Sequence, residues 1–199
     1  IIATMKKGDS TKQLILQQAI SMTSTVGLEA LSIGKLAKAT NMSKSGLFAH
    51  FSSKEKLQVE VLKAAESSFI QSITKAALAA QRGEPRIRAV FERWLEWSNS
   101  NSLPGGCIFI SSAMELAGQT GVVKEFLLKT QKDWMNFLAG AARIAIEEKH
   151  FREDLDVHQF SYEFFSIALT YQYASRLIND KKAETRARKS LESLIQAAK

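Results

Sequence analysis

The sequence predicts an all-α protein of about nine helices. Apolar residues recur at helical spacing along the chain of 199 residues, and 45% of all residues are hydrophobic, which suffices for a sizeable core. Residues that break helices are scarce, since there are only two prolines and ten glycines. We expect an N-terminal helix-turn-helix domain of three helices over residues 1–52, followed by a helical bundle over residues 53–199.

The first helix is predicted over residues 11–26, where four apolar residues share one face: Ile15, Ala19, Met22 and Val26. Gly27 follows as the glycine that commonly terminates a helix. We expect this helix to buttress the two short helices that come next.

Residues 31–51 contain two short helical patterns separated by a tight polar turn. In the turn, Asn41 is one of the few residue types that tolerate the left-handed backbone of a sharp reversal. Ser43 is expected to cap the second helix, and Leu47 and Phe51, at i and i+4, form its buried face. The rest of that helix is polar and basic on its outer side. This pattern is typical of a helix-turn-helix that reads DNA.

Positive charge is concentrated in the same region. Residues 1–56 hold eight lysines and three acidic residues, a net charge of +5, whereas the other 143 residues carry +2 of the total of +7. A surface of this kind favours a polyanionic partner, because neutralised phosphates release counterions. A solvated lysine-rich surface is the alternative for charge alone, but charge together with the motif favours nucleic acid.

The remaining chain continues the helical pattern. A helix over residues 53–81, about 40 Å long at 1.5 Å per residue, is expected to start at a capping box formed by Ser52 and Glu55. Further helices are expected over residues 85–99, 107–118, 122–148, 156–179 and 182–197.

From Gly27 to Leu57 the order and spacing of residues resemble the N-terminal domain of the TetR (tetracycline-repressor) family of bacterial transcriptional regulators. The similarity extends over residues 10–60 without a gap. The residues that carry it are Gly27, Leu31, Ser32, Ile33, Leu36, Ala37, Ala39, Met42, Ser43, Lys44, Leu47, Phe48, His50, Phe51, Lys54, Glu55 and Leu57. Gly34 departs from the pattern, because glycine inside a helix costs about 0.5–1 kcal/mol relative to alanine.

The resemblance implies that the second motif helix enters the major groove of a palindromic double-stranded operator. The residues expected to contact bases or flanking phosphates are Ser32, Ser43, Lys44, Ser45, Gly46, Phe48, His50 and Lys54. Ser43 and Lys44 also lie at a helix N-terminus, which favours phosphate or base-edge contacts. Ser32 has the alternative role of an N-cap, and His50 that of a structural histidine.

The resemblance also implies a small-molecule effector held by the helices between residues 85 and 179. The residues expected to line its pocket are Trp94, Trp97, Cys107, Phe109, Met114, Phe126, Trp134, Phe137, Phe164 and Tyr171. Ordinary core packing is the alternative for more than half of this set. Cys107 has two interpretations: a reactive thiolate at a helix N-terminus, or a buried thiol.

The last two helices carry apolar residues beyond those that one bundle layer needs. In the family, these helices pair with their copies in a homodimer. The residues concerned are Phe160, Phe164, Ile167, Ala168, Tyr171, Leu191, Leu194, Ile195 and Ala198. A two-fold dimer also suits one helix-turn-helix per chain, because half-sites lie about 34–36 Å apart or at multiples of this distance.

The expected function is a ligand-responsive DNA-binding transcriptional regulator, a repressor released from its operator by an apolar or electrophilic effector. The alternative is a helical small-molecule-binding protein without a DNA role. We find no phosphate loop, zinc-ligand spacing or Ser-His-Asp arrangement, so we expect no enzyme and no cofactor. The acidic run with histidines over residues 147–158 is interpreted as a solvated turn rather than a metal site. A single cysteine and the lack of an apolar run of about 20 residues predict a cytoplasmic protein without a membrane role.

Overall fold

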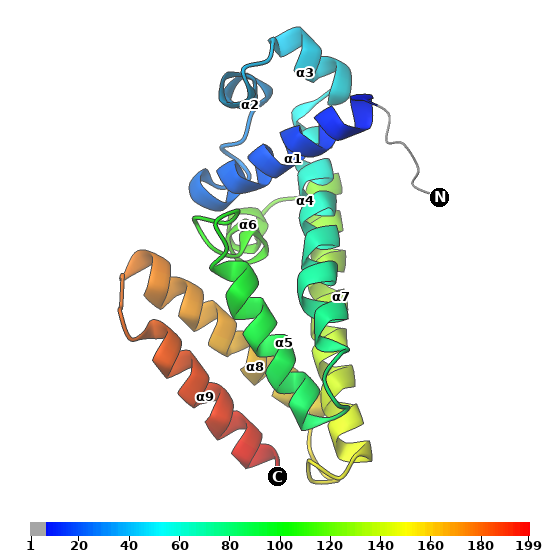
Figure 1. The fold of residues 1–199 in the computed structure, drawn as a ribbon, viewed down its shortest axis with the longest axis vertical. Helices are drawn as coiled ribbons and strands as arrows, with labels where there is room; N and C mark the ends of the chain where they lie inside the picture. The colour runs from blue at the N-terminus through cyan, green and yellow to red at the C-terminus, as the bar shows by residue number, and fades with distance from the viewer. Residues whose placement is uncertain (1–6) are drawn as a thin grey trace. The chain divides into compact units, whose positions relative to one another are not determined.

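The structure is a computed structural model that describes the backbone of residues 7–199 and the side chains of residues 11–199. In this part of the chain there are nine α-helices, two π-helical segments and no strand, which confirms the all-α prediction (Figure 1). No described helix has the length and apolar character needed to cross a bilayer. The chain divides into two compact units. The first holds the described residues up to Ser68 and Asn99–Leu128, and the second holds Phe69–Ser98 and Lys129–Lys199.

The first unit contains α1 (Lys7–Val26), α2 (Ile33–Thr40), α3 (Lys44–His50), most of α4 (Lys54–Phe69), α6 (Ile108–Leu116) and the start of α7 (Val122–Glu147). Its core follows the predicted spacing in part, because Leu36, Leu47 and Phe51 are fully buried whereas Ile33 is half-buried. Val26, predicted on the apolar face of the first helix, is 50% exposed, since it is the last residue of α1. The residues at the centre of this core are Ile15, Ala19, Leu36, Leu47, Phe51 and Leu57. This packing places the outer faces of α2 and α3 at the surface.

Side-chain caps fix the ends of the two motif helices. The Ser32 hydroxyl accepts a hydrogen bond from the backbone N–H of Lys35 at 3.2 Å and caps α2. The Ser43 hydroxyl accepts one from the N–H of Gly46 at 3.1 Å and caps α3. Between them Asn41 adopts a left-handed φ of 56°, as predicted. The turn is therefore built from the residue types that such a reversal requires.

The helix predicted over residues 53–81 is not uniform. α4 gives way to a π-helical segment, η1 (Ile70–Lys75). The cap also differs from the prediction, because the hydroxyl that accepts the N–H of Lys56, at 3.1 Å, belongs to Ser53 and not to Ser52. The wider turn of a π-helix rotates the side chains that follow away from the positions an α-helix would give them.

The second unit contains η1, α5 (Glu84–Ser98), the rest of α7, α8 (Val157–Gln172), η2 (Tyr173–Leu177) and α9 (Ala183–Ala198). α8 and α9 lie side by side and run antiparallel (Figure 1). The core of this unit is rich in aromatic rings. Phe91 packs edge-on against Phe164 with 5.9 Å between ring centroids, and Trp94 packs against Tyr171 at 5.7 Å. Such edge-to-face pairs add to the free energy of burial.

Gly34 lies in α2 at a position where nothing in the structure requires glycine. A Cβ added there would have only the Cε atom of Lys44 within 4 Å, at 3.6 Å, which is an ordinary contact. We expect Gly34→Ala to raise the free energy of unfolding by about 0.5–1 kcal/mol, because alanine loses less backbone entropy on folding. Urea unfolding of this variant beside the unmodified protein measures the change.

Gly46→Ala is the matched comparison for Gly34→Ala. There the new Cβ would lie 3.1 Å from the Ser43 hydroxyl that caps α3, so the cap must shift and no stabilisation is expected. Equal stabilisation of both variants, or a loss of stability in Gly34→Ala, would contradict the packing described for α2.

Candidate nucleic-acid interface

The outer face of α3 is exposed, and its inner face is buried in the core of the first unit. Lys44, Ser45 and Phe48 are all exposed, and the Phe48 ring is 55% accessible. Leu47 and Phe51 are fully buried beneath them. A large aromatic side chain that is left in solvent on a rigid helix is available for contact with a partner.

Ser43 and Gly46 form a coupled pair at the N-terminus of α3. The Ser43 hydroxyl accepts the N–H of Gly46 and lies 3.1 Å from the Ser45 hydroxyl. A Cβ on Gly46 would come within 3.1 Å of the Ser43 oxygen, so a side chain at this position requires the hydroxyl to give way by a few tenths of an ångström.

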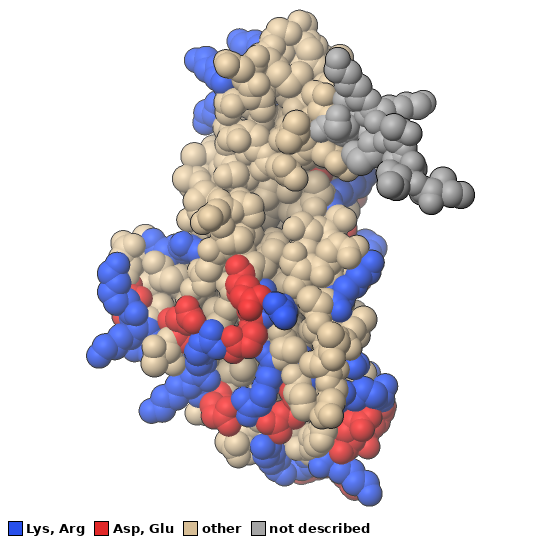
Figure 2. Space-filling model, in the orientation of Figure 1, with Lys and Arg blue, Asp and Glu red and all other residues tan. Residues whose placement is uncertain are grey.

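Uncompensated positive charge surrounds this helix. Four exposed lysines of α2, α3 and α4 pair with no carboxylate among the described side chains: Lys35, Lys38, Lys44 and Lys56. Over α2, the charged side chains visible in Figure 2 are all basic. Lys12 differs, because it donates to Glu60 at 2.7 Å, and this hydrogen bond lowers the pKa of Glu60.

Lys35 and Lys38 are not among the DNA contacts predicted from the sequence. Both lie on α2 away from its buried residue Leu36, and the helical periodicity alone identifies this outer face. Their charges extend the basic surface from α3 to the neighbouring helix.

Besides Ser43, Ser45 and Gly46, three more of the predicted contact residues have partners within the chain. The Ser32 hydroxyl caps α2. The Lys54 ammonium donates to the Glu29 carbonyl oxygen at 2.7 Å and lies 3.6 Å from the Glu29 carboxylate. His50 is half-buried, with its ring centroid 6.1 Å from that of Phe51. Contacts of all eight predicted residues with DNA remain a prediction.

Two family models match the chain. Residues 15–61 match the model described as bacterial regulatory proteins, tetR family. Residues 83–191, more than half of the chain, match the model described as tetracyclin repressor-like, C-terminal domain. The chain belongs to the TetR family. This confirms the resemblance seen between Gly27 and Leu57, and the protein is a ligand-responsive DNA-binding transcriptional regulator.

Solved structures of TetR-family regulators share the fold. A regulator from Chloroflexus aurantiacus superposes with a TM-score of 0.84 at 19% identity over 96% of each chain. A regulator from Cytophaga hutchinsonii gives 0.81 at 19% identity over 98% of each chain. AibR, solved with isovaleryl coenzyme A and operator DNA, gives 0.68 at 22% identity over 88% of this chain and 95% of its own. Among curated proteins, no sequence matches.

Trp97, Trp134 and Phe137, three of the residues predicted to line an effector pocket, meet in the second unit of this TetR-family regulator. The ring of Phe69 packs edge-on against Trp97 at 5.1 Å and against Trp134 at 4.8 Å, and Trp134 stacks on Phe137 at 5.4 Å. Trp134 and Phe137 are half-buried, so part of this cluster is accessible. Phe69 lies at the centre of this cluster, whereas the sequence predicted it only as one of the apolar residues along a helix.

Trp94, Phe164 and Tyr171 belong to a second aromatic cluster around Phe91. All four side chains are buried. They are core residues of the second unit, which is the alternative that the sequence analysis kept open for part of the set.

The other predicted effector residues lie in the first unit. Cys107 is the N-cap residue of α6 and is only 2% exposed, and Phe109 beside it is also buried. Phe126 on α7 is half-buried. Met114 on α6 is 65% exposed, so its side chain faces solvent in this unit.

The apolar residues of α8 and α9 that the sequence analysis assigned to a dimer interface pack within the chain itself. All of them are buried except Ile167, which is half-buried. The exposed apolar residues are different, and each is more than half accessible: Tyr162, Tyr173, Leu177 and Ile178. Helical spacing shows that residues share a face but not whether that face meets its own chain or a partner.

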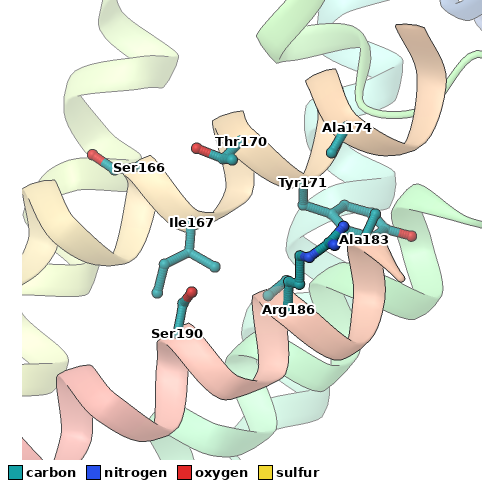
Figure 3. Close-up of a pocket in the computed structure, with 9 residues that line it drawn as sticks. Ser166, Ile167, Thr170, Tyr171, Ala174, Ala183, Arg186 and Ser190 are labelled. Atoms are coloured by element: carbon teal, nitrogen blue, oxygen red, sulfur yellow. The ribbon is translucent and has the colours of Figure 1, made fainter. Parts of the chain in front are cut away.

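α8, η2 and α9 border a groove with a volume of about 220 Å³ (Figure 3). Ile167 and Ser190 point toward one another across it. Most of its lining side chains are small: Ser166, Thr170, Ala174, Ala183, Ala187 and Ser190. Small side chains permit the close approach of another helix, because interaxial distance depends on the residues at the contact.

The acidic run before α8 has structural partners. Arg82 donates to Glu147 at 3.1 Å and to Glu148 at 2.6 Å. Asp156 caps α8, and hydrogen bonds from backbone N–H groups in the first turn of that helix lower the pKa of Asp156. Within the described residues, no group of three potential ligands is arranged to hold a metal ion.

Proposed function

We propose that this protein is a repressor that binds a palindromic operator as a homodimer and leaves it when an apolar or electrophilic effector binds, and that it is not an enzyme. Residues 1–52 form the DNA-binding domain, and residues 53–199 form the domain for effector binding and dimerisation. The protein acts in the cytoplasm, where its single cysteine stays reduced. The observation that carries this proposal is the exposed face of α3 among four lysines that pair with no carboxylate of residues 11–199.

The side chains of α3 suit contacts in the major groove. Lys44 and the hydroxyl of Ser45 donate to phosphate oxygens or base edges, and Phe48 supplies the apolar surface that recognises a thymine methyl group. The coupled Ser43 and Gly46 hold the N-terminus of the helix in place. Lys35 and Lys38 on α2 add charge for the flanking phosphates.

We expect Lys44→Ala to weaken operator binding about tenfold, which corresponds to about 1.4 kcal/mol. The operator duplex is first selected from a random-sequence DNA library with the unmodified protein. Gel-shift titrations at several salt concentrations then give the affinity and its salt dependence. If Lys44 of each subunit contacts a phosphate, the slope of log K against log salt for the dimer falls in magnitude by about 1.8, which is about 0.9 per contact.

Lys75→Ala is the matched control for Lys44→Ala, because Lys75 is also exposed but lies in η1 of the second unit. It removes the same charge and should leave both affinity and slope unchanged. If Lys44→Ala bound the selected duplex as tightly as this control, the assignment of α3 as the recognition helix would fail.

An apolar effector is favoured over one that reacts with Cys107. The half-buried rings of Trp134 and Phe137 offer accessible aromatic surface in the second unit. The Cys107 thiol is only 2% exposed, whereas reactive cysteines are partly accessible. AibR, of similar fold, was solved with isovaleryl coenzyme A and operator DNA, which supports a small-molecule effector for this chain.

The homodimer is proposed to form on α8 and α9. Tyr162, Leu169 and Tyr173, at i, i+7 and i+11, lie on one face of α8 and η2, and Leu177 follows them. On α9, Arg188 and Glu192 are engaged by Glu92 and Arg88 of α5, so these polar groups have partners within their own chain. We propose that the occupant of the exposed apolar face of α8 and η2 is a second copy of the chain.

A further inference from the structure

In the loop between α1 and α2, backbone N–H and carbonyl groups form hydrogen bonds with side chains of α4 and α6. The Glu115 carboxylate of α6 accepts the N–H of Leu28 at 3.2 Å with one oxygen and the N–H of Glu29 at 2.8 Å with the other. Gly27 before them has a left-handed φ of 86°. Two successive N–H groups that converge in this way form a concave site for an anion.

The two carbonyl oxygens of the same dipeptide are held from α4. The Gln58 amide donates to the Leu28 carbonyl at 3.0 Å, and the Lys54 ammonium donates to the Glu29 carbonyl at 2.7 Å. Gln58 is 3% exposed, so this part of the network is shielded from water. Hydrogen bonds from outside the loop therefore fix its conformation.

The position of this loop determines where α2 begins. The buried Leu31 and the cap residue Ser32 follow directly after it. A displacement of Glu115 must therefore either break two hydrogen bonds to the loop or move the start of α2. α2 in turn bounds the turn that leads into α3.

We propose that Glu115 is a positioning residue for DNA binding, the contact through which α6 holds the helix-turn-helix in the conformation that fits the operator. This rests on the proposed function, since it names how the same DNA-binding site is regulated. A change in α6 that withdraws the carboxylate releases the loop and reduces the fraction of molecules that can bind the operator without rearrangement.

The test compares Glu115→Ala, Glu115→Gln and the control Glu125→Ala. Glu125 is an exposed carboxylate of α7 in the same unit, so its loss changes the charge equally. With the duplex selected by the unmodified protein, Glu115→Ala should bind about tenfold more weakly than the control, because both N–H groups lose their acceptor. Glu115→Gln keeps one acceptor oxygen, so its affinity for the duplex should lie between those of Glu115→Ala and Glu125→Ala. This milder variant still tests the proposal if Glu115→Ala does not fold.

Hydrogen exchange of backbone amides supplies a second measurement, which does not depend on DNA. In Glu115→Ala, exchange should accelerate at Leu28 and Glu29 and also in the first turn of α2, while Glu125→Ala should exchange like the unmodified protein. If exchange accelerates at Leu28 and Glu29 alone, or if the affinity of Glu115→Ala equals that of the control, the proposal is wrong. If the unmodified protein selects no DNA sequence, the proposed function fails, and exchange in α2 still decides whether Glu115 positions that helix.

Discussion

Gly105→Ala is expected to lower the free energy of unfolding of the first unit by about 3 kcal/mol or more. A Cβ on Gly105 would lie 1.6 Å from the carbonyl oxygen of Ser24 and 2.3 Å from its carbonyl carbon. Both are backbone atoms near the end of α1, so no side-chain rotation relieves the overlap. The loop must move away, which also breaks the hydrogen bond of 3.2 Å from the Gly105 N–H to the Ser24 hydroxyl.

Urea unfolding followed by circular dichroism measures this loss. Gly118→Ala is the control, because a Cβ there has no heavy atom within 4 Å. Its free energy of unfolding should stay within about 0.5 kcal/mol of the unmodified protein. If Gly105→Ala were as stable as this control, the close approach of the loop to α1 would not exist in solution.

Tyr173→Glu is expected to convert a dimer into a monomer and to weaken binding of the palindromic operator at least about 100-fold, because the two half-sites are then no longer bound by linked subunits. Tyr173 is 56% exposed, so the substitution leaves the core of its own chain intact. Buried against a second copy, however, an unpaired carboxylate is strongly unfavourable. Light scattering gives the mass in solution, and gel shifts with full and half operators give the affinities.

Binding to a half operator should change little in Tyr173→Glu, which separates a lost dimer from a damaged helix-turn-helix. Val122→Glu introduces the same charge at another exposed apolar position, on α7, and should remain dimeric. A stable monomer for the unmodified protein, or a dimer that survives Tyr173→Glu, would count against the interface on α8.

The helix-turn-helix is the part of the fold that the sequence predicts best, for a physical reason. Its determinants act over a few residues: the buried pair Leu47 and Phe51, the cap at Ser43 and the left-handed Asn41 all occur where local rules require them. Local rules decide less where two adjacent residues could both cap a helix. Ser52 and Ser53 both precede α4, and only the structure shows that Ser53 is its cap.

Contacts between distant segments are beyond the reach of such rules. Glu115 reads as an ordinary polar residue of α6, yet it binds backbone groups 86 and 87 positions earlier in the chain. Phe69 likewise becomes the centre of an aromatic cluster only because Trp97 and Trp134 come to it. For a related reason, the sequence does not show that α9 buries its apolar stripe within its own chain.

The tie between Ser43 and Gly46 limits how the recognition helix can be redesigned. Because a side chain at position 46 would crowd the Ser43 hydroxyl, substitutions at the two positions are coupled. Leu47 is fixed by the core. A library intended to change operator preference is therefore best confined to the exposed positions of α3, where substitutions alter the surface without disturbing the helix: Lys44, Ser45, Phe48 and Ala49.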